Sequence, residues 1–109
     1  MERLKLHHHR CICGFCINKG DNFETYDSSV QCWEFAAIGE VSGLGVIKNI
    51  PTSGWARQVA VKKGYGYVAK YLYNDNLMYV RIYVVRYITD SKYHGVMGAE
   101  VNYQYPFVP

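Results

Sequence analysis

The stretch from Leu77 to Thr89 alternates between two kinds of residue almost without a break. One side carries Met78, Val80, Ile82, Val84 and Ile88, and the other carries Leu77, Tyr79, Arg81, Tyr83, Val85, Tyr87 and Thr89. Period-two alternation of β-branched and aromatic residues is typical of a strand with one buried face. Because Arg86 interrupts the more apolar side, we predict a long strand that is bent or bulged near that residue.

Residues 65–73 alternate in the same way, with tyrosine at four of the positions on one side. The triplet Asn74, Asp75 and Asn76 then separates this stretch from the long strand. Asparagine and aspartate tolerate the left-handed backbone region that tight turns require. The two stretches are therefore predicted to pair as an antiparallel hairpin.

Several shorter stretches complete the predicted sheet structure. Residues 31–41 favour a strand, with a short helix as the alternative, and residues 96–105 alternate as a last strand. Residues 46–50 suggest a short strand, and residues 55–63 alternate again. Loops are expected at 20–30, 49–54 and 90–95, where Gly, Pro, Asn, Asp and Ser gather. The fold class predicted from this pattern is all-β, a small antiparallel barrel or sandwich of five to six strands.

The chain divides by composition at residue 22. Its 109 residues are enough for one domain with a modest core. Residues 1–22 are rich in Cys and His and show neither helical nor alternating periodicity, so we predict a flexible N-terminal segment. Residues 23–109 are predicted to form a single β domain.

Charge and hydropathy place few limits on function. The net charge of +3 is too small to predict nucleic-acid binding by itself. No apolar run reaches about eighteen residues, so no transmembrane helix is expected. The start of the chain has no continuous apolar segment of the kind found in a secretory signal, which favours an intracellular protein or a processed one.

Three strings in the chain resemble a known type of domain. They are GWARQVAVKKGYGYVAKY from Gly54, YVRIYVV from Tyr79 and GVMGAEVNYQYPF from Gly95. Together they are similar to a small β domain of unknown function found in predicted secreted proteins and lipoproteins of gut-type Bacteroidetes. The resemblance covers residues from about Trp33 to Phe107. It implies a location in the cell envelope and supplies no catalytic residue.

The N-terminal segment holds a cluster of potential metal ligands, in which Cys13 and Cys16 form a C-x-x-C pair. Thiolates and imidazoles are ligands for zinc, but a second C-x-x-C is missing, and Cys32 or a histidine would have to complete a site. Two disulfides in an oxidising compartment and free thiols are the alternatives. The candidate zinc ligands are His7, His9, Cys11, Cys13 and Cys16.

Tyrosine is the second candidate chemistry, because ten of the eleven tyrosines lie between positions 65 and 105. A tyrosine-rich sheet face can stack sugars, bases or a partner's side chains, and an arginine on that face adds a cation–π or hydrogen-bonding contact. The structural alternative is that cross-strand tyrosines simply stabilise the sheet or fill its core. The candidate ligand-binding residues are Tyr79, Arg81, Tyr83 and Tyr87 on the long strand, with Tyr67 and Tyr71 expected to lie across from them.

The sequence contains no motif for a catalytic residue, and an enzyme ranks third among the function classes. The leading hypothesis is a non-catalytic envelope-type domain that either binds a ligand or partner, such as a glycan or a protein, through its tyrosine-rich face or is simply structural. The second hypothesis is an intracellular module that binds zinc through the Cys/His cluster or associates with nucleic acid.

Overall fold

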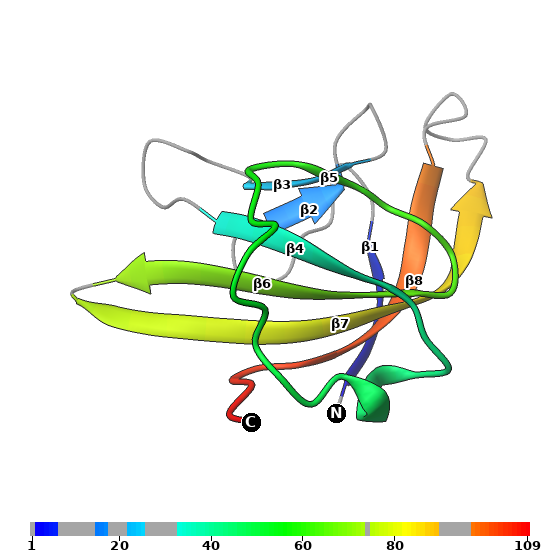
Figure 1. The fold of residues 1–109 in the computed structure, drawn as a ribbon. Coiled ribbons are helices and arrows are strands. Elements are labelled where there is room, and N and C mark those ends of the chain that lie inside the picture. The colour runs from blue at the N-terminus through cyan, green and yellow to red at the C-terminus, as the bar shows by residue number, and fades with distance from the viewer. Residues whose placement is uncertain (1, 7–14, 18–21, 26–32, 74, 90–96) are drawn as a thin grey trace.

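The computed structural model describes residues 2–6, 15–17, 22–25, 33–73, 75–89 and 97–109. These residues form eight β-strands and one 3-10 turn (Figure 1). The strands are β1 (Glu2–Leu6), β2 (Phe15–Ile17), β3 (Asn22–Thr25), β4 (Trp33–Glu40), β5 (Val59–Ala60), β6 (Tyr65–Tyr73), β7 (Asn76–Thr89) and β8 (Met97–Gln104), and the turn η1 is Leu44–Val46.

The strands form two antiparallel sheets. The larger sheet has the order β1-β8-β7-β6-β4, and the smaller has the order β2-β3-β5. The small sheet lies over one face of the large sheet, which we call the inner face (Figure 1). The segment that carries η1 and the C-terminal residues pack on the opposite, outer face. The predicted all-β fold is confirmed, in the form of a small sandwich.

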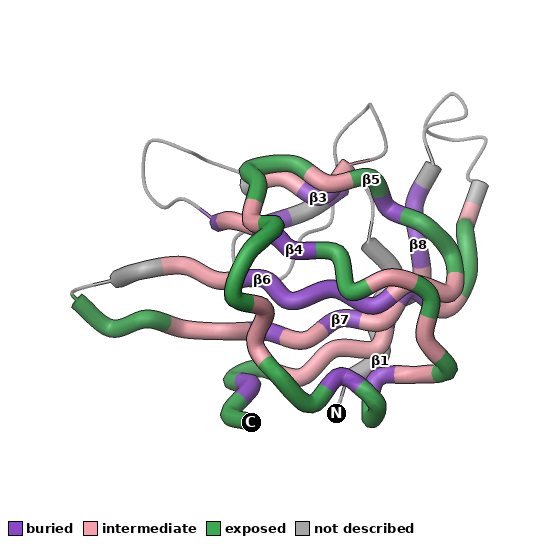
Figure 2. Tube along the Cα trace, viewed as in Figure 1, coloured by how far each residue is buried: buried purple, intermediate pink, exposed green. Residues whose placement is uncertain are grey.

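Aromatic rings fill the space between the two sheets. Phe15 is fully buried, and its ring centroid lies 4.9 Å from that of Trp33 and 5.2 Å from that of Phe35. Phe23 stacks on Phe35 and meets the edge of the Tyr67 ring. The buried positions run along the middle of the large sheet in Figure 2. This inner core is what holds the short strands β2 and β3 in place.

The predicted hairpin is confirmed. β6 and β7 pair antiparallel from Tyr73 opposite Asn76 to Gly66 opposite Tyr83. Asp75 adopts the left-handed conformation, with φ of 63°. The register of β7 against β8 shifts between Val84 and Arg86, as the interruption of the apolar side predicts.

The stretch around Trp33 is a strand, so the helical alternative is wrong. A bulge in β4 between Ala37 and Gly39, where Gly39 has φ of 110°, explains why its alternation is imperfect.

The N-terminal segment is part of the sandwich wherever the structure describes it. β1 pairs with β8 along its whole length, and β2 places Phe15 and Ile17 in the core. The predicted boundary at residue 22 therefore does not separate a flexible segment from the β domain. The described residues form eight strands, more than the five to six predicted. Strands of three to five residues are too short to show a convincing period, so the sequence gives little sign of them.

Three further predictions about the chain's middle need correction. The expected loop over residues 20–30 contains β3, because the ring of Phe23 is buried in the core. The expected strand over residues 46–50 is replaced by η1 and irregular chain, which lets Leu44 and Ile47 enter one cluster on the outer face. Of residues 55–63, only β5 and a single bridge from Ala56 to Phe35 are strand-like.

The described part of the chain contains no helix long and apolar enough to cross a membrane.

Candidate functional site

The sheet register divides the predicted tyrosine face in two. Tyr67 lies opposite Ile82 and Tyr71 opposite Met78, whereas Tyr79 lies opposite Lys70. Directly paired residues share a face, and each odd-numbered residue of β6 is paired with an even-numbered residue of β7. Tyrosines at odd positions in both strands therefore point to opposite sides, and the prediction of one shared face is wrong.

The bulge in β7 removes one more residue from the predicted set. Beyond Val84, the register shift pairs Tyr87 with Ala99, a fully buried inner-face residue. The Tyr87 hydroxyl accepts a hydrogen bond from the backbone N–H of Lys63 at 2.9 Å. Tyr79, Arg81 and Tyr83 thus stay together on the outer face, while Tyr67, Tyr71 and Tyr87 belong to the inner side.

Tyr67 is a core residue with a structural hydrogen-bonding role. Its side chain is fully buried, and its hydroxyl donates to the carbonyl of Ala60 at 2.7 Å. The same hydroxyl accepts from the backbone N–H of Lys62 at 2.8 Å. These bonds fix the segment between β5 and β6 against the sheet. Tyr71 also packs inward, with its ring centroid 4.3 Å from that of Trp33.

The environment of Tyr67 predicts a loss of stability at alkaline pH. Burial raises the pKa of Tyr67 from 10.0 to about 12, and the hydrogen bond from Lys62 offsets only part of that rise. The folded protein therefore holds this proton more tightly than the unfolded chain, so the contribution is fully present below pH 10.0 and is lost as pH rises towards about 12.

The prediction is tested by urea unfolding of the parent protein and of Tyr67→Phe across this pH range. At neutral pH the variant should be less stable by about 1 kcal/mol, because it loses both hydrogen bonds. The difference between the two proteins should shrink as pH rises above 10.0. A difference that is constant with pH would contradict the assignment of this titration to Tyr67.

Arg81 is the centre of the outer face, but its guanidinium group is engaged within the protein. Nη1 donates to the carbonyls of Ile47 at 2.9 Å and Leu44 at 3.2 Å, and Nε donates to Oε1 of Gln104 at 2.7 Å. The guanidinium carbon also lies 5.2 Å from the centroid of the Phe107 ring. Arg81 thus fastens the η1 segment and the C-terminal residues to the sheet.

A half-buried aromatic surface lies on the same outer face as Arg81. The ammonium group of Lys70 lies 4.2 Å from the centroid of the Trp55 ring, and the Tyr79 ring centroid lies 6.5 Å from that of Trp55. Glu34 is paired with Lys70 in the sheet register. All four side chains are half-buried. We call Glu34, Trp55, Lys70 and Tyr79 the outer aromatic surface.

Trp55, Glu34 and Lys70 were not predicted as site residues from the sequence. The Trp55 indole N–H donates to the carbonyl of Pro51 at 3.2 Å, which holds the irregular loop and the ring together. A tryptophan directly after a turn that contains Pro and Gly is noticeable in the sequence as a possible surface aromatic residue. The sequence does not show which strand of the sheet its ring packs on.

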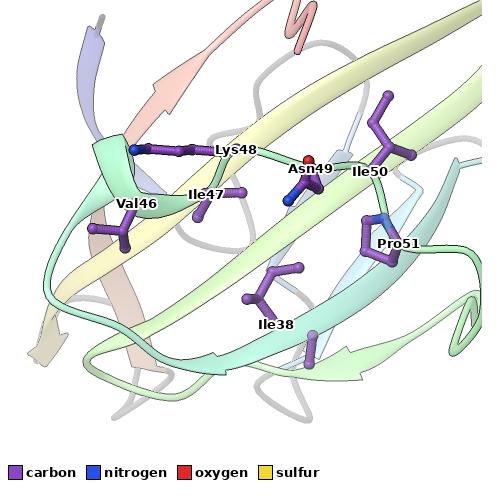
Figure 3. Close-up of a pocket in the computed structure, with 8 residues that line it drawn as sticks. Ile38, Val46, Ile47, Lys48, Asn49, Ile50 and Pro51 are labelled. Carbon is purple, nitrogen blue, oxygen red and sulfur yellow. The ribbon is translucent and has the colours of Figure 1, made fainter.

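A groove lies further along the same loop, with a volume of about 330 Å³. Figure 3 shows Ile38 rising from β4 on one side, with the segment from Val46 to Pro51 along the other. The lining is largely aliphatic, and the polar side chains in it are Lys48 and Asn49. Ala37 completes the lining on β4.

Most of the predicted zinc ligands lie outside the described residues, namely His7, His9, Cys11 and Cys13. Cys16 lies in β2, opposite Glu24 of β3. Within the described ranges no group of three His, Cys, Asp or Glu residues could hold a metal ion. Zinc binding therefore stays a prediction.

Comparisons of the chain with protein-family models, with curated proteins and with solved structures give no match. The resemblance to the Bacteroidetes domain is accordingly an expectation from the sequence.

Proposed function

We propose that this protein is a non-catalytic binding domain whose outer aromatic surface contacts a glycan. The observation that carries the proposal is the grouping of Trp55, Lys70 and Tyr79, in which the Lys70 ammonium lies over the half-buried Trp55 ring and the half-buried Tyr79 ring lies beside it. Aromatic rings offer a flat apolar face with a polar rim, and this combination suits ligands that are partly apolar and partly hydroxylated. The C–H face of a sugar ring has that character.

The four residues of the outer aromatic surface contribute different interactions to glycan binding. The parts of the Tyr79 and Trp55 rings that are not buried against the outer cluster provide stacking surfaces. The Glu34 carboxylate accepts hydrogen bonds from sugar hydroxyls, and the Lys70 ammonium donates to sugar oxygens. We assign Arg81 a structural role, because its Nε and Nη1 donors hold Gln104, Leu44 and Ile47.

Cello-, chito- and mannohexaose are suitable probes, titrated by calorimetry and by tryptophan fluorescence. One of them should bind, and Tyr79→Leu or Trp55→Leu, which remove the ring but keep an apolar side chain, should weaken binding by about tenfold or more. Tyr87→Leu is the matched control, because Tyr87 is exposed but lies on the other side of the sheet. Thermal unfolding of each variant checks the fold.

Two results would overturn the proposal. One is the failure of all three oligosaccharides to bind the folded parent protein. The other is binding that Tyr79→Leu and Trp55→Leu leave unchanged. Salt separates the nucleic-acid alternative, because phosphate contacts weaken steeply between roughly 50 and 200 mM salt whereas sugar stacking does not.

An envelope location is also part of the proposal, and it is supported by the sequence resemblance alone. Cell fractionation of the protein expressed from its natural gene tests this location. Recovery with the envelope fraction would agree with it, and recovery in the cytosol would contradict it.

Zinc binding is a second candidate function, supported by the spacing of the C-x-x-C pair in the sequence. Cys16 lies in β2, so a metal held by Cys16 would be attached to a strand of the small sheet. Native mass spectrometry with added zinc tests this candidate. A bound zinc that Cys13→Ser and Cys16→Ser both remove would support it and would favour an intracellular module, and a metal-free chain would exclude it.

A further inference from the structure

The segment that carries η1 leaves β4 and returns to it after crossing the outer face of the large sheet (Figure 1). We call residues 42–55 the outer strap. Just before the strap, the backbone N–H of Val41 bonds to the carbonyl of Gly64 at 3.0 Å and continues the pairing of β4 with β6. Just after it, Ala56 exchanges two backbone hydrogen bonds with Phe35 of β4, at 2.7 and 2.9 Å. Both ends of the strap are therefore held on β4.

Between these ends the strap has few polar attachments. Among the described residues, its hydrogen bonds to the rest of the chain are the two from Nη1 of Arg81, to the carbonyls of Leu44 at 3.2 Å and Ile47 at 2.9 Å. The bond from the N–H of Ile47 to Leu44 and the bond from the Trp55 indole to Pro51 both lie within the strap. A strap that moved as a unit would keep these internal bonds and lose those from Arg81.

The apolar contact of the strap with the sheet is also small. Leu44 and Ile47 are its buried residues, and they form the outer cluster with Val68 and Phe107. This cluster has four buried residues, whereas the described part of the inner core has thirteen. Segments with few buried apolar contacts open at a lower free energy than the core of the same protein. The strap is therefore the part of the outer layer that we expect to open first.

The strap is fitted closely to β6 but not to β4. A Cβ atom at Gly66 of β6 would lie 2.7 Å from Cδ1 of Ile47, so the missing side chain there lets the strap approach the sheet. Over β4, in contrast, the groove of about 330 Å³ lies between Ile38 and strap residues 46–51 (Figure 3). Val46 stays 50% exposed beside it. The strap thus rests on one line of contacts, the line at which Arg81 holds it.

We propose that the outer strap undocks as a unit while the sandwich stays folded, and that Arg81 stabilises the docked form. Trp55 belongs to the strap, and its ring contacts Lys70 and Tyr79 only in the docked form described here. A glycan that uses this arrangement would select the docked strap, a consequence that rests on the proposed function. Arg81 is then a positioning residue for the outer aromatic surface.

Hydrogen exchange followed by NMR in low concentrations of urea tests the undocking. The Ile47 amide and the Trp55 indole N–H report on the strap, and the amide of Ile82, a fully buried residue of the β6–β7 hairpin, reports on the sandwich. The strap protons should be less protected than Ile82 by about tenfold or more. Their exchange should hardly depend on urea, because undocking exposes little surface, whereas exchange at Ile82 should rise steeply.

Three variants separate undocking of the strap from unfolding of the sandwich. Arg81→Lys keeps the charge but loses the planar fork, so it should speed exchange at Ile47 by about tenfold or more. Arg86→Lys is the matched control, since Arg86 lies on the same strand and pairs with Glu100 rather than with the strap. Phe15→Leu weakens the inner core, so it should speed exchange at Ile82 and leave Ile47 unchanged.

Either of two results would overturn the undocking. One is exchange at Ile47 that follows exchange at Ile82 both in urea and in Phe15→Leu, because the strap would then open only with the sandwich. The other is exchange at Ile47 that Arg81→Lys leaves unchanged.

The link to binding is tested with whichever of the three hexasaccharides binds. At ten times its Kd, a sugar that binds only the docked form should slow exchange at Ile47 by about tenfold. Bound sugar that leaves this exchange unchanged would overturn the link. Failure of all three sugars to bind would instead overturn the proposed function, and the urea experiment would still decide whether the strap undocks.

Discussion

Replacing Arg81 with alanine should lower the free energy of unfolding by about 3 kcal/mol, because a cationic donor that holds several buried acceptors is lost. The side chain joins three parts of the fold, namely β7, the η1 segment and β8. Without it, the carbonyl of Ile47 loses the Arg81 donor, and the carbonyl of Leu44 keeps only the backbone N–H of Ile47 at 3.1 Å, although both residues are nearly fully buried. The loop that carries Trp55 should then loosen from the sheet.

Urea unfolding of Arg81→Ala and Arg81→Lys measures this effect. Lysine keeps the charge but loses the planar fork, so it should recover only part of the stability. Arg86→Ala is the control on the same strand, because the ion pair of Arg86 with Glu100 is at 3.1 Å with Arg86 55% exposed. Such a pair contributes up to about 1 kcal/mol. Equal losses for Arg81→Ala and Arg86→Ala would contradict the role assigned to Arg81.

Phe15→Ala should be similarly damaging, with an expected loss of about 3–5 kcal/mol from the cavity left in the core. The Phe15 ring contacts the rings of Phe23, Trp33 and Phe35 and has no exposed surface. A loss of this size is a large part of the stability of a small domain. A flexible lead-in would instead tolerate the change.

Chemical denaturation of Phe15→Ala and of the milder Phe15→Leu checks this prediction. Leu77→Ala is the control, because that side chain is 51% exposed near the hairpin turn and should change stability by less than about 0.5 kcal/mol. An unfolding midpoint for Phe15→Ala that matches that of the parent would show that β2 is not part of the cooperative core.

The sequence predicted the elements with long, uninterrupted patterns. The hairpin of β6 and β7 was predictable because each strand shows its own alternation and the residues between them suit a tight turn. β2 and β3 were not predicted, because strands of three and four residues gain their stability from tertiary contacts of Phe15 and Phe23. The strand predicted over residues 46–50 is the end of η1 followed by irregular chain, because aliphatic residues alone do not distinguish a strand from such a segment.

The candidate site was less predictable than the fold, because it depends on register. The alternation within one strand shows which of its residues share a face. Which residues of the neighbouring strand lie on that same face of the sheet depends on the pairing register. The shift at Val84 moved Tyr87 to the inner side, and the pairing of odd with even positions did the same for Tyr67 and Tyr71. Arg81 was correctly placed beside Tyr79 and Tyr83, but its internal partners come from residues far away in the chain.

The most direct test of the central claim is NMR chemical-shift mapping of the parent protein with the best-binding hexasaccharide. The account predicts that the perturbed signals cluster at Trp55, Lys70, Tyr79 and Glu34, with the indole N–H of Trp55 among the largest changes. Signals of the inner face, such as those of Tyr67 and Val101, should stay where they are. Perturbations confined to other surfaces, or none at saturating sugar, would contradict the assignment of the outer aromatic surface as the binding site.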